Sequence, residues 1–394
     1  MKHNHDSIAR TRIEAIDLLK GLVMVIMALD HARDYFHYSA FMFDPSDPAR
    51  STLPIAFTRF ISNFCAPAFS FLAGLSAFMI GKRKSPRELS SFLFKRGLWL
   101  VFIEIIIVSF GFKFDIQFRH IGLQTIWQLG MSMIVLAGLI HLPQKIVLAF
   151  SCIIIFGHNL LDGTHFDGNI LWAMLHEPRL FEWWNGHYFR TAYPLLPWIA
   201  VMSLGYCFGS LYDHSFDVEK RKKILTSLGI GSIILLFILI SINMYGDPVP
   251  WTNYGFTEKT LMSIFNMHKY PPSLLYLLTT LGATMLFLAN TEELKGKIVD
   301  FFCVFGRVPF FYYIIHIYLI HIIAVFVARF TGFGWHALVL PTFITKVEAL
   351  KGYGVNLIFV YLIWISVVVL LYPLCKKFDQ FKQGHKEKWL LSYL

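Results

Sequence analysis

Long apolar runs constrain this chain more than any other feature of its sequence. Runs of roughly 18–25 residues recur along it between short polar loops, and a helix of that length crosses ~30 Å of hydrocarbon. Of the 394 residues, 56% are hydrophobic and 15% are charged, whereas about a quarter are charged in ordinary soluble domains. We therefore predict an all-α fold, a multi-pass integral membrane bundle in which residues 1–394 form one domain within the lipid bilayer.

About ten transmembrane helices are predicted from the apolar windows and their flanking charges. We place them at 15–37, 54–81, 91–112, 122–141, 144–161, 194–212, 224–243, 271–290, 302–328 and 354–374. The loops after the second span and before the seventh are rich in Lys and Arg, as are the leader 1–13 and the tail 375–394. The positive-inside rule puts all of these in the cytoplasm, with both termini, and favours the cytoplasmic (inner) membrane. The net charge of +10 is thereby explained without nucleic acid.

The first span ends in a polar cluster, "ALDHARDYFHY" at 28–38, where each charge inside a bilayer costs several kcal/mol. On a helix with about 100° per residue, Asp30, Asp34 and His37 share one face. Asp34 is three residues from both His31 and His37, so it can reach either. These four residues are our catalytic candidates.

A structural explanation of the same cluster is equally open. Arg33 can simply neutralise Asp30 at an interface, with Asp34 solvated and His31 as a hydrogen-bonded core residue. The second span adds Arg59 and Asn63, one helical turn apart and near the same outer level. Taken alone, Arg59 is expected to snorkel outward; its approach to the level of Asp30 and Asp34 favours a shared site.

Two further spans carry polar residues at depth. Glu104 needs a partner or a proton, and Trp127 and Gln128 of the next span are candidate contacts. His316 and His321 are five residues apart and point about 140° from each other, so one helix face cannot bring both to a metal. No Cys/His motif is present, and we expect no metal site.

Several stretches resemble one family of membrane enzymes. They are "RIEAIDLLKGLVMVIMALDHARDYF", "TRFISNFCAPAFSFLAGLSAFMIG", "FLFKRGLWLVFIE" and "FGRVPFFYYIIHIYLIH". Together they resemble bacterial membrane proteins grouped with heparan-α-glucosaminide N-acetyltransferase, from about residue 12 to the C-terminus. The resemblance implies a transmembrane acetyltransferase that takes acetyl-CoA from the cytoplasm and acetylates an amino sugar or related glycan on the far side.

The resemblance also bears on the choice of histidine. In the animal enzymes a His beyond the outer end of the first helix is central to transfer, and an Asn on that helix assists. Counted from Gly21 and Met27, that Asn falls at or beside His31, and no His follows His37 before the second span. Both histidines therefore remain candidates. Lys20 stands where the family usually has Arg, which keeps the charge but loses the bidentate fork.

The chemistry suits these residue types. An amine that attacks a thioester loses a proton, so a base with a pKa near neutrality is needed, and a neighbouring carboxylate such as Asp34 would orient a His for that task. The residues expected to contact the acceptor or the developing oxyanion are Arg33, Arg59, Asn63 and His316. Those expected to bind the phosphates of CoA are Lys20, Arg96 and Arg307. Direct transfer and an acetyl-histidine intermediate are both compatible with this set.

Two other functions are kept open. A proton-coupled transporter or flippase would use Asp30, His31, Glu104 and His316 as a relay. A membrane O-acyltransferase would have a hydroxyl acceptor instead of an amine. The sequence leaves the acceptor and the oligomeric state undetermined, and a homo-oligomer is compatible with it.

Overall fold

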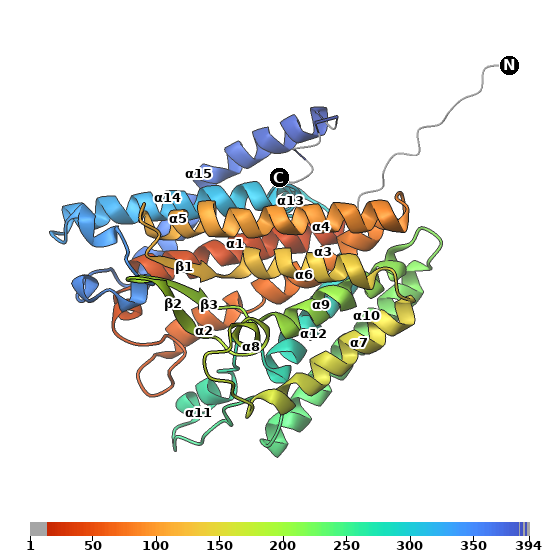
Figure 1. Cartoon of the computed structure of the whole chain (residues 1–394), viewed down its shortest axis with the longest axis horizontal. Coiled ribbons are helices and arrows are strands. Elements are labelled where there is room, and N and C mark those ends of the chain that lie inside the picture. The colour runs from red at the N-terminus through yellow and green to blue at the C-terminus, as the bar shows by residue number, and fades with distance from the viewer. Residues whose placement is uncertain (1–13, 386, 389–390, 392–394) are drawn as a thin grey trace.

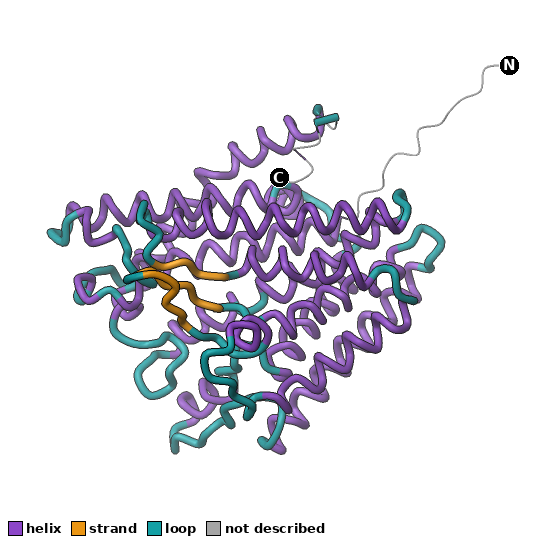
Figure 2. Tube along the Cα trace, viewed as in Figure 1, coloured by secondary structure: helices purple, strands orange, loops and turns teal. Residues whose placement is uncertain are grey.

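The computed structural model describes residues 14–385, 387–388 and 391 (Figure 1). The leader 1–13 and part of the basic tail lie outside the described residues. Helices make up most of the described chain, and a small sheet lies at one end of the bundle (Figure 2). The predicted all-α membrane class is confirmed, with this sheet as an addition that the sequence did not predict.

The helices are α1 (Glu14–Phe36), α2 (Leu53–Ser62), α3 (Cys65–Gly81), α4 (Pro86–Ile103), α5 (Ser109–Lys113), α6 (Thr125–Leu139), α7 (Gln144–Gly157), α8 (Ile170–Leu175), α9 (Leu195–Phe208), α10 (Val218–Ile242), α11 (Thr257–Ile264), α12 (Leu274–Thr291), α13 (Lys297–Arg307), α14 (Pro309–Phe330) and α15 (Leu357–Gly384). A π-helical turn, Glu104–Val108, joins α4 to α5. The strands are β1 (His120–Leu123), β2 (Leu180–Trp184) and β3 (His187–Thr191). Short 3₁₀ turns occur at Tyr38–Phe41, His158–Leu161, Gly209–Tyr212, Trp335–Leu338, Ile344–Lys346 and Glu348–Leu350.

Each predicted span coincides with one helix or with two consecutive helices. Among the described residues, 7 helical segments are long and apolar enough to cross a membrane. The remaining predicted spans correspond to α1 and α4, which carry several charges, and to α6, which has only 15 residues. The number of spans and the side of the termini stay predictions.

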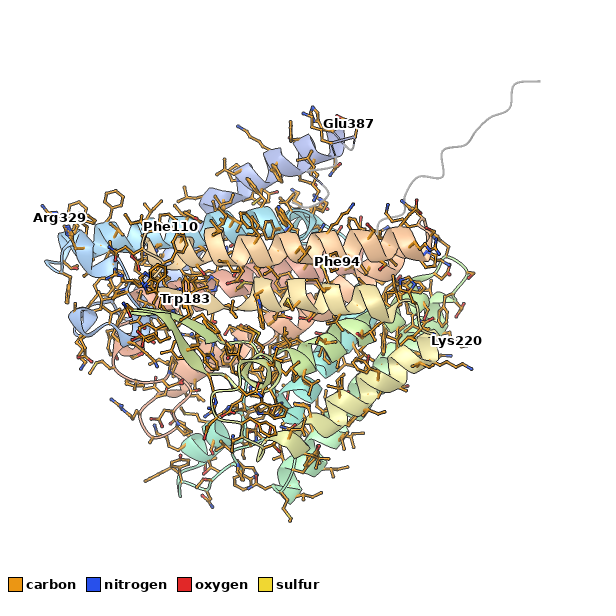
Figure 3. The ribbon with its side chains drawn as sticks, viewed as in Figure 1. Phe94, Phe110, Trp183, Lys220, Arg329 and Glu387 are labelled. Atoms are coloured by element: carbon orange, nitrogen blue, oxygen red, sulfur yellow. The ribbon has the colours of Figure 1, made fainter. Side chains whose placement is uncertain are left out.

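The surface of the bundle is apolar between its ends. Figure 3 shows Phe94 and Phe110 along the bundle, whereas Lys220 and Arg329 lie at opposite ends of it. Phe94 is 47% exposed, and many other large apolar side chains of the long helices are exposed as well. Contiguous apolar surface of this kind is unfavourable in water and suits contact with lipid.

Helix α1 runs through the interior of the bundle. It packs against α2, α3 and α12, and against α13, α14 and α15. Two glycines allow α13 to approach closely: a Cβ on Gly21 would lie 1.8 Å from the Phe302 carbonyl oxygen, and one on Gly306 would lie 1.8 Å from the Asp17 carbonyl oxygen. This contact fixes α1, with its polar cluster, among the other helices.

We expect Gly306→Ala to lower the thermal midpoint of the detergent-solubilised protein. The added methyl group would overlap the Asp17 carbonyl, and overpacking of this kind costs about 1–3 kcal/mol or more. The matched control is Gly138→Ala in α6, where an added Cβ meets nothing within 4 Å. Equal thermal midpoints for the two variants would contradict a tight α1–α13 contact.

The sheet has the strand order β1-β3-β2. Strand β1 is parallel to β3, with Gly122 opposite Arg190, and β2 is antiparallel to β3. The chain turns between β2 and β3 within the segment "EWWNGHY" at 182–188. In Figures 1 and 2 the sheet lies at the end of the bundle opposite the start of α1, so it sits near the polar end of that helix.

Candidate active site

A cavity of about 610 Å³ lies where the polar end of α1 meets the sheet. Residues from segments 40–45 and 343–351 complete its wall. We call it the outer cavity, because the predicted topology puts this end of α1 outside. Its lining residues on α1 are Asp30, His31, Arg33 and Asp34. These four residues of the cluster singled out in the sequence therefore line one cavity together.

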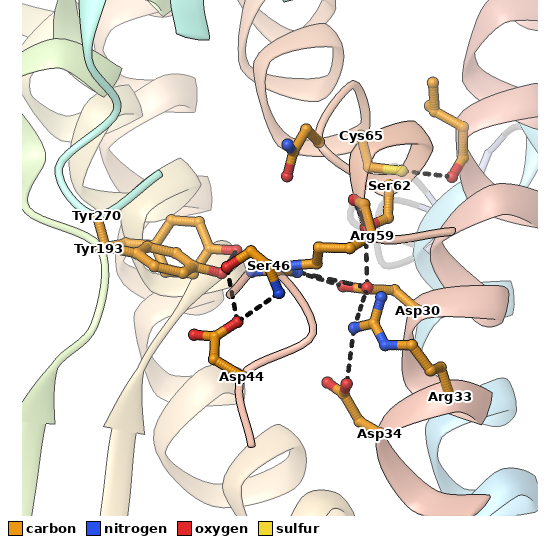
Figure 4. A network of polar contacts seen from close by, with 12 residues as sticks. Asp30, Arg33, Asp34, Asp44, Ser46, Arg59, Ser62, Cys65, Tyr193 and Tyr270 are labelled. Atoms are coloured by element: carbon orange, nitrogen blue, oxygen red, sulfur yellow. Dashed lines mark hydrogen bonds and ion pairs between the residues drawn. The ribbon is translucent and has the colours of Figure 1, made fainter. Parts of the chain in front are cut away.

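Asp30 is the centre of an ion-pair network (Figure 4). Its Oδ1 lies 2.6 Å from Arg33 Nη2, and its Oδ2 lies 3.2 Å from Arg59 Nη1. Ser62 Oγ donates to Asp30 Oδ1 at 2.8 Å. Arg33 Nη2 also lies 2.7 Å from Asp34 Oδ1. Arg33 thus neutralises Asp30, as the structural explanation had it, and it also pairs with Asp34, which therefore contacts Arg33 instead of a histidine.

His31 is paired with a histidine from α14. His31 Nδ1 lies 2.8 Å from His316 Nε2, and His316 Nδ1 lies 2.9 Å from the carbonyl oxygen of Tyr312. A carbonyl can only accept, so His316 Nδ1 donates to it. Neutral His316 then accepts at Nε2 from His31 Nδ1–H, which leaves a free lone pair on His31 Nε2. The outer cavity thus contains an unprotonated imidazole nitrogen with a defined tautomer.

His37 has a different environment. It is 1% exposed and is not among the residues that line the outer cavity. Its Nδ1 lies 2.6 Å from Ser39 Oγ and accepts from the Ser39 backbone N–H at 3.3 Å. His37 therefore caps the turn that follows α1.

The residues predicted to contact the acceptor or the oxyanion do not all line the same cavity. Arg59 lines the outer cavity, whereas Asn63 borders a separate apolar cavity of about 290 Å³ between α2 and α11. Arg59 lines both. His316 is fully buried behind His31 and acts on the cavity only through that residue.

A second cavity, of about 210 Å³, lies along the other half of α1. We call it the inner cavity; Lys20 and Arg96 are among its lining residues. Thr125 and Tyr313 line both the inner and the outer cavity. The two cavities therefore adjoin at these residues, and together they follow the face of α1 from Lys20 to His31.

Two of the three residues predicted to bind CoA line the inner cavity, and the third does not. Lys20 and Arg96 line the inner cavity, and Lys20 Nζ donates to Ser76 Oγ at 3.0 Å. Arg307 is not among the lining residues of that cavity. Its Nε donates to Asp379 Oδ2 at 2.7 Å, in an ion pair that joins α13 to α15.

Glu104 has a structural partner at the start of α6. Its Oε2 accepts from the backbone N–H groups of Ile126 and Trp127, at 2.9 and 3.1 Å. A carboxylate is favoured there because the first N–H groups of a helix lack intrahelical acceptors. The predicted contact with Trp127 is confirmed through its backbone, whereas Gln128 donates to Ser70 Oγ at 3.0 Å instead.

The two histidines of α14 have separate partners. His316 contacts His31, while His321 lies 2.8 Å from the Gly111 carbonyl and 2.9 Å from the Leu338 carbonyl. Within the part of the chain that the structure describes, no group of three or more His, Cys, Asp or Glu side chains is arranged to hold a metal ion.

Sequence reasoning missed the cavity residues that come from loops and strands. They include His120, Arg190, Tyr193, Tyr270 and Lys346. The hydroxyls of Tyr193 and Tyr270 lie 3.3 Å apart. Burial raises the pKa of Tyr270, but the positive charges of Lys269 and Arg59 outweigh it and hold that pKa below its usual value. No local pattern marks these residues, because they come together only through the tertiary fold.

The family model for the catalytic domain of heparan-α-glucosaminide N-acetyltransferase matches residues 12–242, more than half of the chain. The chain belongs to this family. The resemblance to the heparan-α-glucosaminide N-acetyltransferase family is thereby confirmed over that range, which extends to the end of α10. The extension of the resemblance beyond residue 242, where His316 lies, stays a prediction. No curated protein matched the chain. Family membership makes this protein a membrane-embedded acyltransferase of the acetyl-transferring type.

Proposed function

We propose that this protein moves an acetyl group from cytoplasmic acetyl-CoA to the amine of an amino sugar or related glycan on the outer side. The observation that carries the proposal is the junction of the inner and outer cavities at Thr125 and Tyr313, with His31 on the outer side of it. An acetyl group that enters from one cavity can meet an acceptor in the other without either substrate crossing the protein.

The inner cavity suits acetyl-CoA in both charge and polarity. Lys20 and Arg96 are positioned to contact phosphates, and Met24, Met27 and Phe69 offer an apolar wall to the pantetheine arm. The apolar wall of this cavity suits that arm better than the charged nucleotide of CoA. The nucleotide would therefore remain at the inner end, and the thioester would reach the junction.

The chemistry then follows from the tautomer of His31. The amine nitrogen of the acceptor attacks the thioester carbonyl carbon and forms a C–N bond; the C–S bond breaks, and CoA leaves as the thiolate. The amine proton passes to His31 Nε2, and His316 positions the ring by accepting from Nδ1–H. The proton is then released to the thiolate or to water, which restores the free base.

The test is a reconstitution with purified protein. Incubated with acetyl-CoA and glucosamine, the protein should release CoA thiol and form N-acetylglucosamine, which mass spectrometry identifies. An acetyl product that alkali hydrolyses would show an O-acyltransferase instead. Absence of CoA release with every amine and hydroxyl acceptor tried would refute the proposal.

We expect Arg96→Gln to raise the KM for acetyl-CoA about tenfold with little change in kcat. A hydrogen bond between charged groups contributes about 1.5–3 kcal/mol, and 1.4 kcal/mol corresponds to a factor of ten. The matched control is Arg307→Gln, which removes the ion pair with Asp379 but no lining residue of the inner cavity. If only the control variant raised the KM, the phosphates would have to bind beside α13.

A further inference from the structure

The acetyl transfer proposed above leaves one cavity beside the polar cluster without a role. It is the apolar cavity of about 290 Å³ between α2 and α11, which we call the side cavity. Arg59 lines both the side cavity and the outer cavity. Pro45 lines the outer cavity, and the next residue, Ser46, lines the side cavity. The two cavities therefore adjoin at Arg59 and at the loop that follows α1.

The wall of the side cavity is mainly apolar. Its apolar lining residues, from α2 and from α11 with the residue that follows it, are Leu53, Ala56, Phe57, Phe60, Leu261, Met262 and Phe265. The rings of Phe60 and Phe265 meet edge to face, with centroids 5.6 Å apart. Lys259 Nζ of α11 donates to the Ser51 carbonyl oxygen at 2.7 Å, just before α2. These contacts hold the two helices together around an apolar space, which suits a hydrocarbon ligand.

The rim of the side cavity is made of exposed apolar side chains. Phe57 is 59% exposed, and Leu53 and Leu261 are exposed as well. Helix α11 has only 8 residues, too few to cross a bilayer, and Phe256 just before it is 74% exposed. A short helix flanked by exposed apolar residues suits the boundary between lipid and water. Under the predicted topology, the rim therefore faces the hydrocarbon of the outer leaflet.

The boundary with the outer cavity is polar instead. Arg59 is paired there with Asp30, and its side chain is 20% exposed. Asn63, one helical turn further along, borders the side cavity and is almost fully buried. From the rim to the outer cavity the lining thus changes from apolar to polar. A ligand that matches this order has a hydrocarbon chain toward the lipid and a polar head toward His31.

We propose that the side cavity binds a hydrocarbon chain that anchors the acceptor to the membrane. The amino sugar reaches the outer cavity past Arg59, while its chain stays between α2 and α11. This inference rests on the proposed function, because it specifies how the acceptor of that reaction is carried. The acceptor is then a lipid-linked amino sugar that arrives from the side, within the outer leaflet, and not a glycan dissolved in water.

The test compares methyl, octyl and dodecyl glucosaminide as acceptors for the protein in nanodiscs. We expect the dodecyl sugar to have a kcat/KM at least about tenfold above that of the methyl sugar, with the octyl sugar between them, because each methylene buried against an apolar wall strengthens binding. Partition into the nanodisc raises the local concentration of the longer sugars by the same factor for every variant. Variants therefore assign the preference to the side cavity.

Ala56→Phe fills the side cavity, and Phe57→Ser makes its rim polar. Each should lower the dodecyl-to-methyl ratio of kcat/KM at least about threefold below the wild-type ratio. The matched control is Phe237→Ser on α10, because Phe237 is also about half exposed but does not line the side cavity. This control should keep the wild-type ratio. A ratio that neither substitution at α2 lowers would overturn the proposal.

A photocrosslinking measurement separates this inference from the proposed function. Dodecyl glucosaminide with a diazirine on its chain should label peptides of α2 and α11 in the wild-type protein, and excess unlabelled dodecyl glucosaminide should prevent the labelling. Labelling of these peptides without acetylation of any amine would refute the acetyl transfer and leave the chain site standing. Acetylation of all three sugars with equal efficiency, and labels spread evenly over the lipid-facing helices, would overturn the chain site alone.

Discussion

His31→Ala should lower the rate of acetyl transfer by about 10²–10⁴-fold, because a positioned general base contributes that much. His31 lines the outer cavity, and its contact with His316 at 2.8 Å leaves its Nε2 unprotonated. The residue lies outside the inner cavity, so binding of acetyl-CoA should be retained. CoA release with glucosamine measures the first effect, and stabilisation of the purified variant by acetyl-CoA measures the second.

His37→Ala is the matched control for this substitution. It removes the cap on the turn that follows α1, so it should lower the thermal midpoint while turnover per folded molecule stays near the wild-type value. The opposite pattern, an active His31→Ala protein and an inactive His37→Ala protein of normal stability, would transfer the role of base to His37.

Arg33→Met should lower the free energy of unfolding by about 3–5 kcal/mol, the cost of removing one partner from a buried ion pair. Arg33 is 1% exposed and neutralises two carboxylates, so its loss leaves Asp34 without its partner and Asp30 with Arg59 alone. Chemical or thermal unfolding of the detergent-solubilised protein measures the change. The double variant Arg33→Met/Asp34→Asn should recover part of the stability, because one unpaired charge is removed.

Lys82→Met serves as the control for the loss of an ion pair at the surface. Lys82 is paired with Asp213, but its side chain is 51% exposed, and such pairs contribute only about 0–1 kcal/mol. Equal destabilisation by Arg33→Met and Lys82→Met would mean that water reaches the Asp30 network and screens it.

The helices could be predicted from the sequence because the requirement for crossing a membrane is local. A backbone in hydrocarbon must satisfy its own hydrogen bonds, so each long apolar run is expected to form a helix. The predicted span 224–243 lies almost entirely within α10, and within the predicted span 302–328 a new helix, α14, begins at Pro309. Proline favours the first turn of a helix because it lacks the N–H that would be unpaired there.

The sheet could not be predicted in the same way. Its strands have only four or five residues, and β1 pairs with β3 across a long stretch of intervening chain. Segments that short have no reliable periodicity, and their pairing is set by the elements that bring them together. The cavity residues Arg190 and Lys346 were missed for the same reason.

The sequence by itself determined that the protein is a helical membrane protein of this family, and that the end of the first helix carries the costly polar residues. Apolar run length and intramembrane charge are properties of neighbouring residues, so both can be read along the chain. The tertiary structure alone decided how those residues are paired. Helical spacing let Asp34 reach His31 or His37, but in the folded protein Asp34 pairs with Arg33. Helix packing brings His316, from a helix far along the chain, into contact with His31. Hydrogen-bond partners of this kind depend on how distant helices pack, and spacing along one helix does not encode that packing.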